Sequence, residues 1–92
     1  MPRSEGKYRV VIYNTRRLWV GGRISDFHII WALRRTLDVG LEQAKHHVIK
    51  RFPREESVAF KYWTLVGNLP IQTATDLKRY LEGRGFLAEV RI

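Results

Sequence analysis

The pattern of apolar and polar positions along the chain predicts three β-strands. Lys7 to Tyr13 (KYRVVIY) and Ser57 to Val66 (SVAFKYWTLV) are rich in β-branched and aromatic residues, as strands are. In the segment 86–92 (FLAEVRI), successive side chains would point to opposite faces of a strand. One face then consists of Phe86, Ala88, Val90 and Ile92. The middle strand is apolar on both faces, so its register stays open.

The same pattern predicts three helices. Apolar residues recur at helical spacing over 27–37, 41–52 and 73–83, with Ser25 as the N-cap of the first helix. Gly40, Pro53 and Gly83 are expected to end the three helices. The apolar stripes that should face the core are Phe27, Ile30, Leu33 and Leu37 in the first helix, Leu41, Ala44, Val48 and Phe52 in the second, and Ala74, Leu77 and Leu81 in the third.

These elements occur in the order β-α-α-β-α-β. In 92 residues they most simply form a two-layer α+β fold, with three helices packed on one face of a three-stranded antiparallel sheet. The whole chain, 1–92, is expected to be a single domain. The long connection after the first strand could itself contain a short strand over 17–20, which would pair with the first strand through a turn near Asn14 and Thr15.

Basic residues exceed acidic ones by a margin that changes the functional picture. Lys and Arg number 17 and Asp and Glu number 9, for a formal net charge of +8. The excess is concentrated in residues 1–25 and 45–54, whereas the other segments are nearly balanced. Two such clusters indicate a basic surface that faces an acidic partner; the alternative is that a GC-rich genome raises the arginine content.

Several classes of function lack the residues they need. The chain has no cysteine, no hydrophobic leader at its start and no apolar run near the roughly 20 residues of a membrane span. His46 and His47 lie about 100° apart on a helix and cannot chelate one ion together, and His28 stands alone. We therefore expect a non-enzymatic protein with no cofactor, metal site or membrane segment, located in the cytoplasm or an organellar matrix.

One local pattern resembles a known family. The stretch DVGLEQAKHHV, residues 38–48, resembles the helix-turn-helix of the C-terminal domain of the bacterial ribosomal stalk protein, which runs glycine, leucine, two polar residues, Ala-Lys and valine. The similarity extends loosely over 7–92, and YRVVIYN is more weakly similar to the first strand of the similarly folded Clp protease adaptor family. The resemblance implies a docking face for translational GTPases on the first two helices. Arg34 and Lys45 match basic positions of that face, whereas Asp26 and Trp31 stand where the family usually has lysines.

The segment NTRRLWVGGR, residues 14–23, is long for a connection between a strand and a helix, which usually needs about two to six residues. It combines three arginines with Trp19 and the turn-forming pair Gly21-Gly22, a composition typical of interface hot spots. We predict that it grips an acidic surface on a large assembly such as the ribosome, a translation factor, a polymerase or a Clp-type ATPase. The alternative is a β-hairpin whose tryptophan packs on its own domain. The predicted protein-binding residues are Arg16, Arg17, Trp19, Arg23, Trp31, Arg34 and Lys45.

Two environments are open for Trp31. It is one helical turn from Arg34 and Arg35, so a cation–π contact is feasible; alternatively it closes the edge of the core.

A second hypothesis is an RNA- or DNA-binding protein, with a ribosome-associated protein as one form of it. In this hypothesis arginines hold phosphates, and aromatic residues on the sheet face that points away from the helices stack on bases. The residues assigned to it are Arg16, Arg17, Arg23, Lys50, Arg51, Arg54, Lys61 and Trp63, with Arg9, Tyr13 and Arg91 on the same platform. A third is a homodimer through the outer sheet face, because a strand that is apolar on both sides usually has both faces covered. The segment 18–20 is the other candidate cover for that face.

Overall fold

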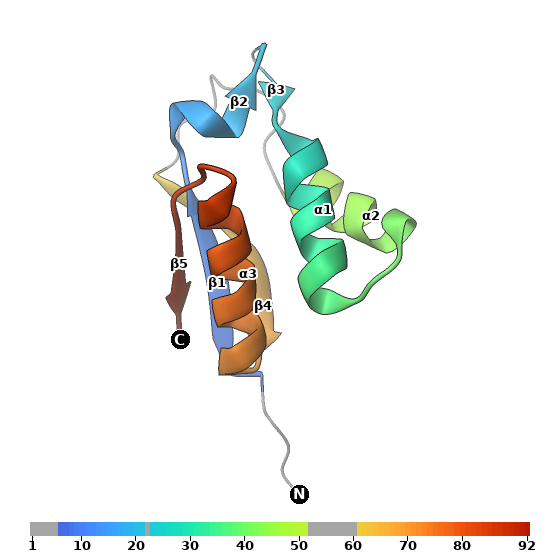
Figure 1. Ribbon diagram of the computed structural model, residues 1–92, viewed down its shortest axis with the longest axis vertical. Helices are drawn as coiled ribbons and strands as arrows, with labels where there is room; N and C mark the ends of the chain where they lie inside the picture. Colours follow the sequence, from blue (N-terminus) through green and yellow to red (C-terminus); the bar gives the residue numbers. More distant parts are fainter. Residues whose placement is uncertain (1–5, 22, 52–60) are drawn as a thin grey trace, which may run out of the picture.

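The computed structural model describes residues 6–21, 23–51 and 61–92, which form an α+β fold (Figure 1). In chain order the elements are β1 (Tyr8–Tyr13), the 3₁₀ turn η1 (Arg16–Leu18), β2 (Trp19–Val20), β3 (Arg23–Ile24), α1 (Asp26–Leu37), α2 (Leu41–Arg51), β4 (Tyr62–Leu69), α3 (Ile71–Gly83) and β5 (Ala88–Arg91). The main sheet is antiparallel with the order β4-β1-β5. The predicted fold class is confirmed.

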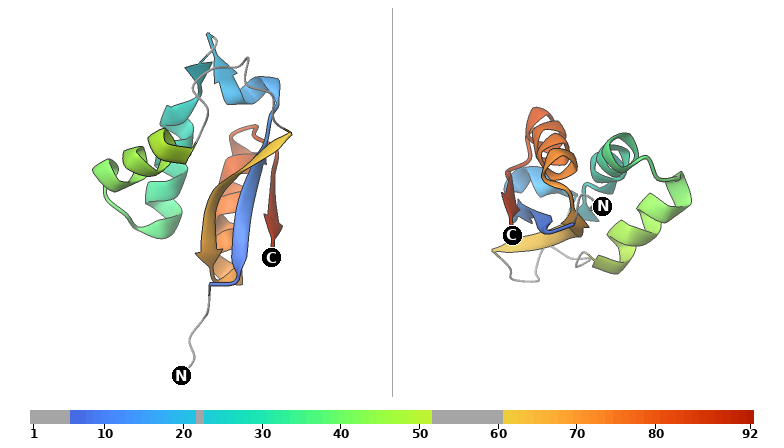
Figure 2. Two further views of the ribbon diagram at one scale, coloured as in Figure 1. Left: turned by 180° about the vertical axis from the view of Figure 1, so that it is seen from behind. Right: turned by 90° about the horizontal axis from the view of Figure 1, so that it is seen from below.

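The three helices meet the sheet in different ways. α3 lies along β1 and β5, α1 packs against both α3 and α2, and α2 reaches β4 (Figure 2). α3 begins at Ile71, two residues before the predicted start, because its N-cap residue Pro70 is extended and the chain turns into the helix directly after it. α1 ends with Asp38 as its C-cap, in the left-handed conformation with φ 54°, rather than at Gly40.

Two irregularities in β4 determine its register. The partner of Val11 is Thr64, two residues rather than one from the partner of Val10, so Leu65 is an extra residue in the bulged strand. A second shift lies beside Asn68, whose φ of 57° is in the left-handed region. β4 therefore continues to Leu69, beyond the predicted end at Val66, whereas residues 57–60 of the predicted strand lie outside the described residues.

The outer face of the sheet is polar rather than apolar. Ile12 faces the helices, and Trp63, which pairs with it, packs against the same core. The prediction that placed Trp63 on an outer-face platform for nucleic acid is therefore wrong. Around the buried Val11, the outer face carries Arg9, Tyr13, Tyr62, Thr64, Glu89 and Arg91. Among the described residues, this face lacks the broad apolar surface that the predicted homodimer would bury.

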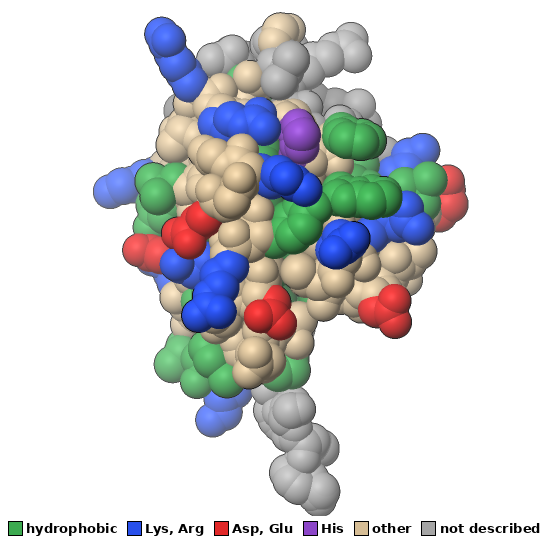
Figure 3. Space-filling model, viewed as in Figure 1, with side chains coloured by type: hydrophobic (Ala, Val, Ile, Leu, Met, Phe, Trp, Pro, Cys, Tyr) green, Lys and Arg blue, Asp and Glu red, His purple; other side chains and the backbone are tan. Residues whose placement is uncertain are grey.

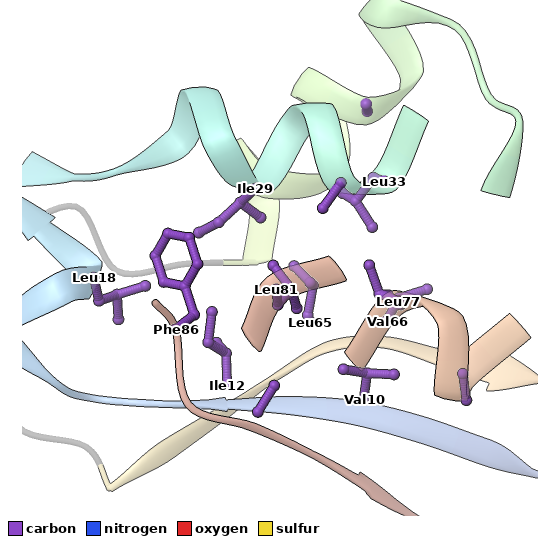
Figure 4. Close-up of a cluster of buried hydrophobic side chains, with 14 of the residues drawn as sticks. Val10, Ile12, Leu18, Ile29, Leu33, Leu65, Val66, Leu77, Leu81 and Phe86 are labelled. Carbon is purple, nitrogen blue, oxygen red and sulfur yellow. The ribbon is translucent and has the colours of Figure 1, made fainter. Parts of the chain in front are cut away.

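The hydrophobic core lies between the sheet, α1 and α3 (Figure 4). The stripe predicted for α3 is buried as expected. In α1, Leu33 is buried and Ile30 and Leu37 pack against the core, as predicted. Ile29 and Ala32 are buried as well, whereas Phe27 is 70% exposed, so the buried face is shifted away from Phe27. In α2, Ala44 is buried and Leu41 is exposed.

The long connection after β1 forms a hairpin that closes one end of this core. β2 pairs with β3 around Gly21, which has φ 61°, and the backbone N–H of Ser25 donates to the Leu18 carbonyl over 2.6 Å. Leu18 and Trp19 belong to the core cluster, with Trp19 9% exposed. The predicted role of Trp19 as a partner contact is therefore wrong. The expected short strand exists over 19–20, but it pairs with β3 rather than β1 and does not cover the outer sheet face.

A hydrogen bond fixes the indole of this buried tryptophan, since Trp19 Nε1 donates to Asn14 Oδ1 over 2.7 Å. We expect Asn14→Ala to lower the free energy of unfolding by about 1–3 kcal/mol, because the part-buried indole N–H loses this acceptor. Urea denaturation measures the change. Asn14→Asp keeps an oxygen at the same position and should cost less; equal losses in the two variants would contradict a role for the hydrogen bond.

Candidate docking surface

The exposed face of α1 carries two large aromatic side chains. Phe27 is 70% exposed and Trp31 39% exposed, and their rings stack with centroids 6.5 Å apart and planes 10° from parallel. The spacing of four residues places both on one helix face. The Arg34 guanidinium carbon lies 5.3 Å from the centroid of the Trp31 ring, a cation–π contact worth about 0.5–1 kcal/mol at an exposed site. The cation–π alternative for Trp31 is confirmed, and Trp31 is not among the residues that pack against the core cluster.

Ring contacts continue from α1 to the turn between α3 and β5. The rings of Phe27 and His28 meet edge to face with centroids 5.6 Å apart, and the His28 ring lies 6.4 Å from that of Phe86. The guanidinium carbon of Arg17 lies 4.8 Å from the centroid of the Phe86 ring, and Arg17 Nε donates to the Arg84 carbonyl over 2.8 Å. Arg17 thus ties η1 to the C-terminal end of α3.

The turn that receives Arg17 depends on a glycine. Gly85 has φ 93°, and a Cβ at this position would lie 3.2 Å from Arg17 Nε. Beyond it, Arg84 Nη2 donates to the Tyr80 hydroxyl over 2.9 Å, and its guanidinium carbon lies 4.8 Å from the centroid of the Tyr80 ring. One continuous series of contacts therefore runs from α1 to α3. We call it the aromatic–arginine ridge, formed by Arg17, Phe27, His28, Trp31, Arg34, Tyr80, Arg84 and Phe86.

The ridge is basic and its arginines are free of ion pairs within the described part of the chain. The ion pairs between described residues join Lys78 to Glu82 and Arg91 to Glu89, and neither includes an arginine of the ridge. Figure 3 shows hydrophobic and basic side chains beside a histidine on the face formed by α1 and α3. Such a surface presents apolar area and uncompensated positive charge together.

A second polar cluster lies on the outer sheet face and is satisfied internally. The Tyr13 hydroxyl donates to Glu89 Oε1 over 2.8 Å, and Arg91 donates to both, from Nη2 to the Tyr13 hydroxyl over 2.8 Å and from Nε to Glu89 over 3.0 Å. The Arg91 guanidinium also lies 4.6 Å from the centroid of the Tyr62 ring. Hydrogen bonds from Tyr13 and Arg91 hold the pKa of Glu89 below its ordinary value. These groups use one another as partners, which makes the cluster a weaker candidate site than the ridge.

The structure brings together only part of the predicted sites. Of the predicted protein-binding residues, those on the ridge are Arg17, Trp31 and Arg34. Arg16 on η1, Lys45 on α2 and Lys61 before β4 are exposed. The side chains of Arg23, Lys50 and Arg51 lie outside the described part, and Arg54 lies outside it entirely.

Sequence reasoning missed five members of the ridge, which are Phe27, His28, Tyr80, Arg84 and Phe86. For Phe27 a signal exists, because it stands four residues before Trp31 and shares its face with Arg34. For Phe86 and Arg84 no local sequence pattern indicates a place on the ridge, because only the tertiary packing of α3 and β5 brings them near α1.

The chain matches no protein-family model, no curated protein and no solved structure. Among the described residues, no helix is long and apolar enough to cross a membrane. In the same ranges, no group of three or more His, Asp or Glu side chains is placed to hold a metal ion. Function is therefore inferred from the chemistry of the ridge.

Proposed function

We propose that the chain is a non-enzymatic binding module that docks through the aromatic–arginine ridge onto an acidic protein surface of a larger assembly. The observation that carries the proposal is the exposed, stacked pair Phe27 and Trp31 with the Arg34 guanidinium over the Trp31 ring. Tryptophan and arginine dominate the binding energy of protein interfaces, and their partners pack around a desolvated centre. An exposed pair of aromatic side chains on a helix is suited to be the centre of such an interface.

The charge of the surface supports an acidic partner. The chain has a net charge of +8, and the arginines of the ridge make no ion pair with a described residue. Complementary charge speeds association and suppresses wrong partners. Residues 38–48 resemble the ribosomal stalk family, whose first two helices dock translational GTPases, and this resemblance supports a translation factor as the partner. A ribosome, polymerase or Clp-type ATPase is supported only by the charge of the chain.

Nucleic acid is the alternative partner for the same charge. Base stacking needs an aromatic face that is open to the ligand. The Trp31 ring is contacted by Phe27 from the preceding turn and by Arg34 from the following turn, so part of its surface is already occupied within α1. This arrangement favours insertion of the aromatic pair into a protein surface over stacking with bases.

Affinity capture from extract of the native cell, with and without nuclease treatment, tests the proposal. We expect the wild-type chain to retain a protein partner, and Trp31→Ala to weaken this binding by roughly 30-fold, as loss of a hot spot of about 2 kcal/mol does. Arg34→Glu should abolish it through charge repulsion. The matched control is Lys7→Glu, which makes the same charge change at an exposed position before β1 and should bind like wild type. Retention that disappears with nuclease, or that Trp31→Ala leaves intact, would contradict protein docking.

A further inference from the structure

Within the described part of the chain, β5 forms a regular edge of the main sheet. The strand order β4-β1-β5 gives β5 no second neighbour among the described strands, and Figures 1 and 2 show no described element beyond it. Proteins usually blunt such edges with bulges, short strands or charged side chains, and β5 is four residues long and carries two charges but has no bulge. The opposite edge, β4, has two register shifts, whereas β5 pairs with β1 in unbroken register from Arg91 opposite Arg9 to Ala88 opposite Ile12.

The hydrogen bonds to β1 show which backbone groups of β5 face outward. The backbone N–H of Tyr13 donates to the Leu87 carbonyl over 2.8 Å. Because bonded and unbonded pairs alternate in an antiparallel ladder, Glu89 and Arg91 also direct their backbone groups to β1. The backbone N–H and C=O groups of Ala88 and Val90 therefore point to the free edge.

The side chains of β5 are self-complementary about Val90. In an antiparallel pairing centred on this residue, Val90 exchanges two backbone hydrogen bonds with the partner's Val90, and Glu89 lies directly opposite the partner's Arg91. Opposed charges at directly facing positions stabilise a strand pair. Glu89 and Arg91 form an ion pair with each other on the outer face, where Tyr13 contacts both, so this pairing extends the existing network to the partner's pair. On the inner face, Ile92, which is 83% exposed, comes to lie opposite the partner's Ala88.

We propose that two copies of the chain associate through their β5 strands and extend each three-stranded sheet into one continuous sheet. This interface is separate from the aromatic–arginine ridge and does not depend on the proposed function. The paired segment is short and each copy carries a net charge of +8, so the dimer is expected to be weak and to dissociate on dilution. Salt at about 0.15 M, where the screening length is about 8 Å, reduces the long-range repulsion between copies.

Sedimentation velocity over a wide range of protein concentrations, at this salt, gives the first test. We expect a monomer–dimer equilibrium for wild type and a monomer for Val90→Pro. Proline removes the outward N–H but no hydrogen bond to β1, and it is tolerated in edge strands. The matched control, Val90→Ile, keeps the N–H and should dimerise. A wild-type chain that stays monomeric at every concentration, or a Val90→Pro chain that dimerises like wild type, would overturn the proposal.

Charge reversal gives a second test that does not depend on proline. Glu89→Arg places Arg opposite the partner's Arg91, and Arg91→Glu places Glu opposite the partner's Glu89, so each variant alone should be monomeric. An equimolar mixture restores both opposed pairs and should form a heterodimer. Circular dichroism checks that each variant is folded. A mixture of folded variants that remains monomeric, or single variants that dimerise as wild type does, would exclude pairing through β5.

Discussion

Trp19→Ala is expected to lower the free energy of unfolding by about 3–5 kcal/mol, because it removes a large ring from the core and leaves a cavity. Trp19 is 9% exposed and belongs to the same cluster as Val10, Ile12 and Leu18. The effect is a large part of the total stability of a small domain, which is about 5–15 kcal/mol. Urea denaturation followed by circular dichroism measures it.

The matched control is the same replacement at Trp31. Its ring is exposed on α1 and outside the core cluster, so Trp31→Ala should cost about 1 kcal/mol or less, mainly the contact with Arg34. The two tryptophans therefore separate stability from binding. Similar losses for both replacements would contradict the assignment of Trp19 to the core and Trp31 to the surface.

Phe86→Ala has the second largest expected effect, a loss of about 3–5 kcal/mol in the free energy of unfolding. Phe86 is 3% exposed and lies among Leu18, Ile12 and Ile29 (Figure 4), while its ring also contacts the Arg17 guanidinium. The replacement removes volume from the core and also removes the ring that the Arg17 guanidinium contacts in the ridge. Thermal and urea unfolding both report the loss.

Phe86→Leu distinguishes the two contributions of the ring. Leucine keeps most of the apolar volume, so its cost should be clearly smaller than that of alanine. It removes the aromatic face that Arg17 contacts, and the Arg17 side chain should lose order, visible in the NMR signal of its Nε–H. Equal stability losses for Phe86→Leu and Phe86→Ala would show that packing volume is not what Phe86 supplies.

The periodicity of the sequence was sufficient for the elements and their order, because strand and helix patterns are local. It did not determine the phase of α1. Residues 29–33 are all apolar, so several stripes fit the same segment, and only packing against α2 and α3 selects Ile29, Ala32 and Leu33 for burial. The helical spacing therefore predicts Phe27 in the core, whereas the structure places it on the surface.

The register of β4 also required three-dimensional information. Both faces of the segment are apolar, and the bulge at Leu65 shifts the pairing in a way that no alternation pattern reveals. Trp63 consequently faces the core.

Trp19 also could not be placed from the sequence. Three arginines around a tryptophan are typical of an interface, yet the hairpin formed by β2 and β3 places the ring in the core. Basic composition predicted an acidic partner, but the residues of the ridge come together only through tertiary packing.

Photo-crosslinking from position 27 in the native cell tests the docking proposal most directly. Phe27 is 70% exposed, so a benzophenone side chain fits there without disturbing the core, and Lys7 is an exposed control position away from the ridge. We predict adducts at position 27 that are destroyed by protease, resist nuclease and are absent from position 7. Adducts at position 27 that are destroyed by nuclease, or the same adducts from both positions, would contradict a protein-docking role for the ridge.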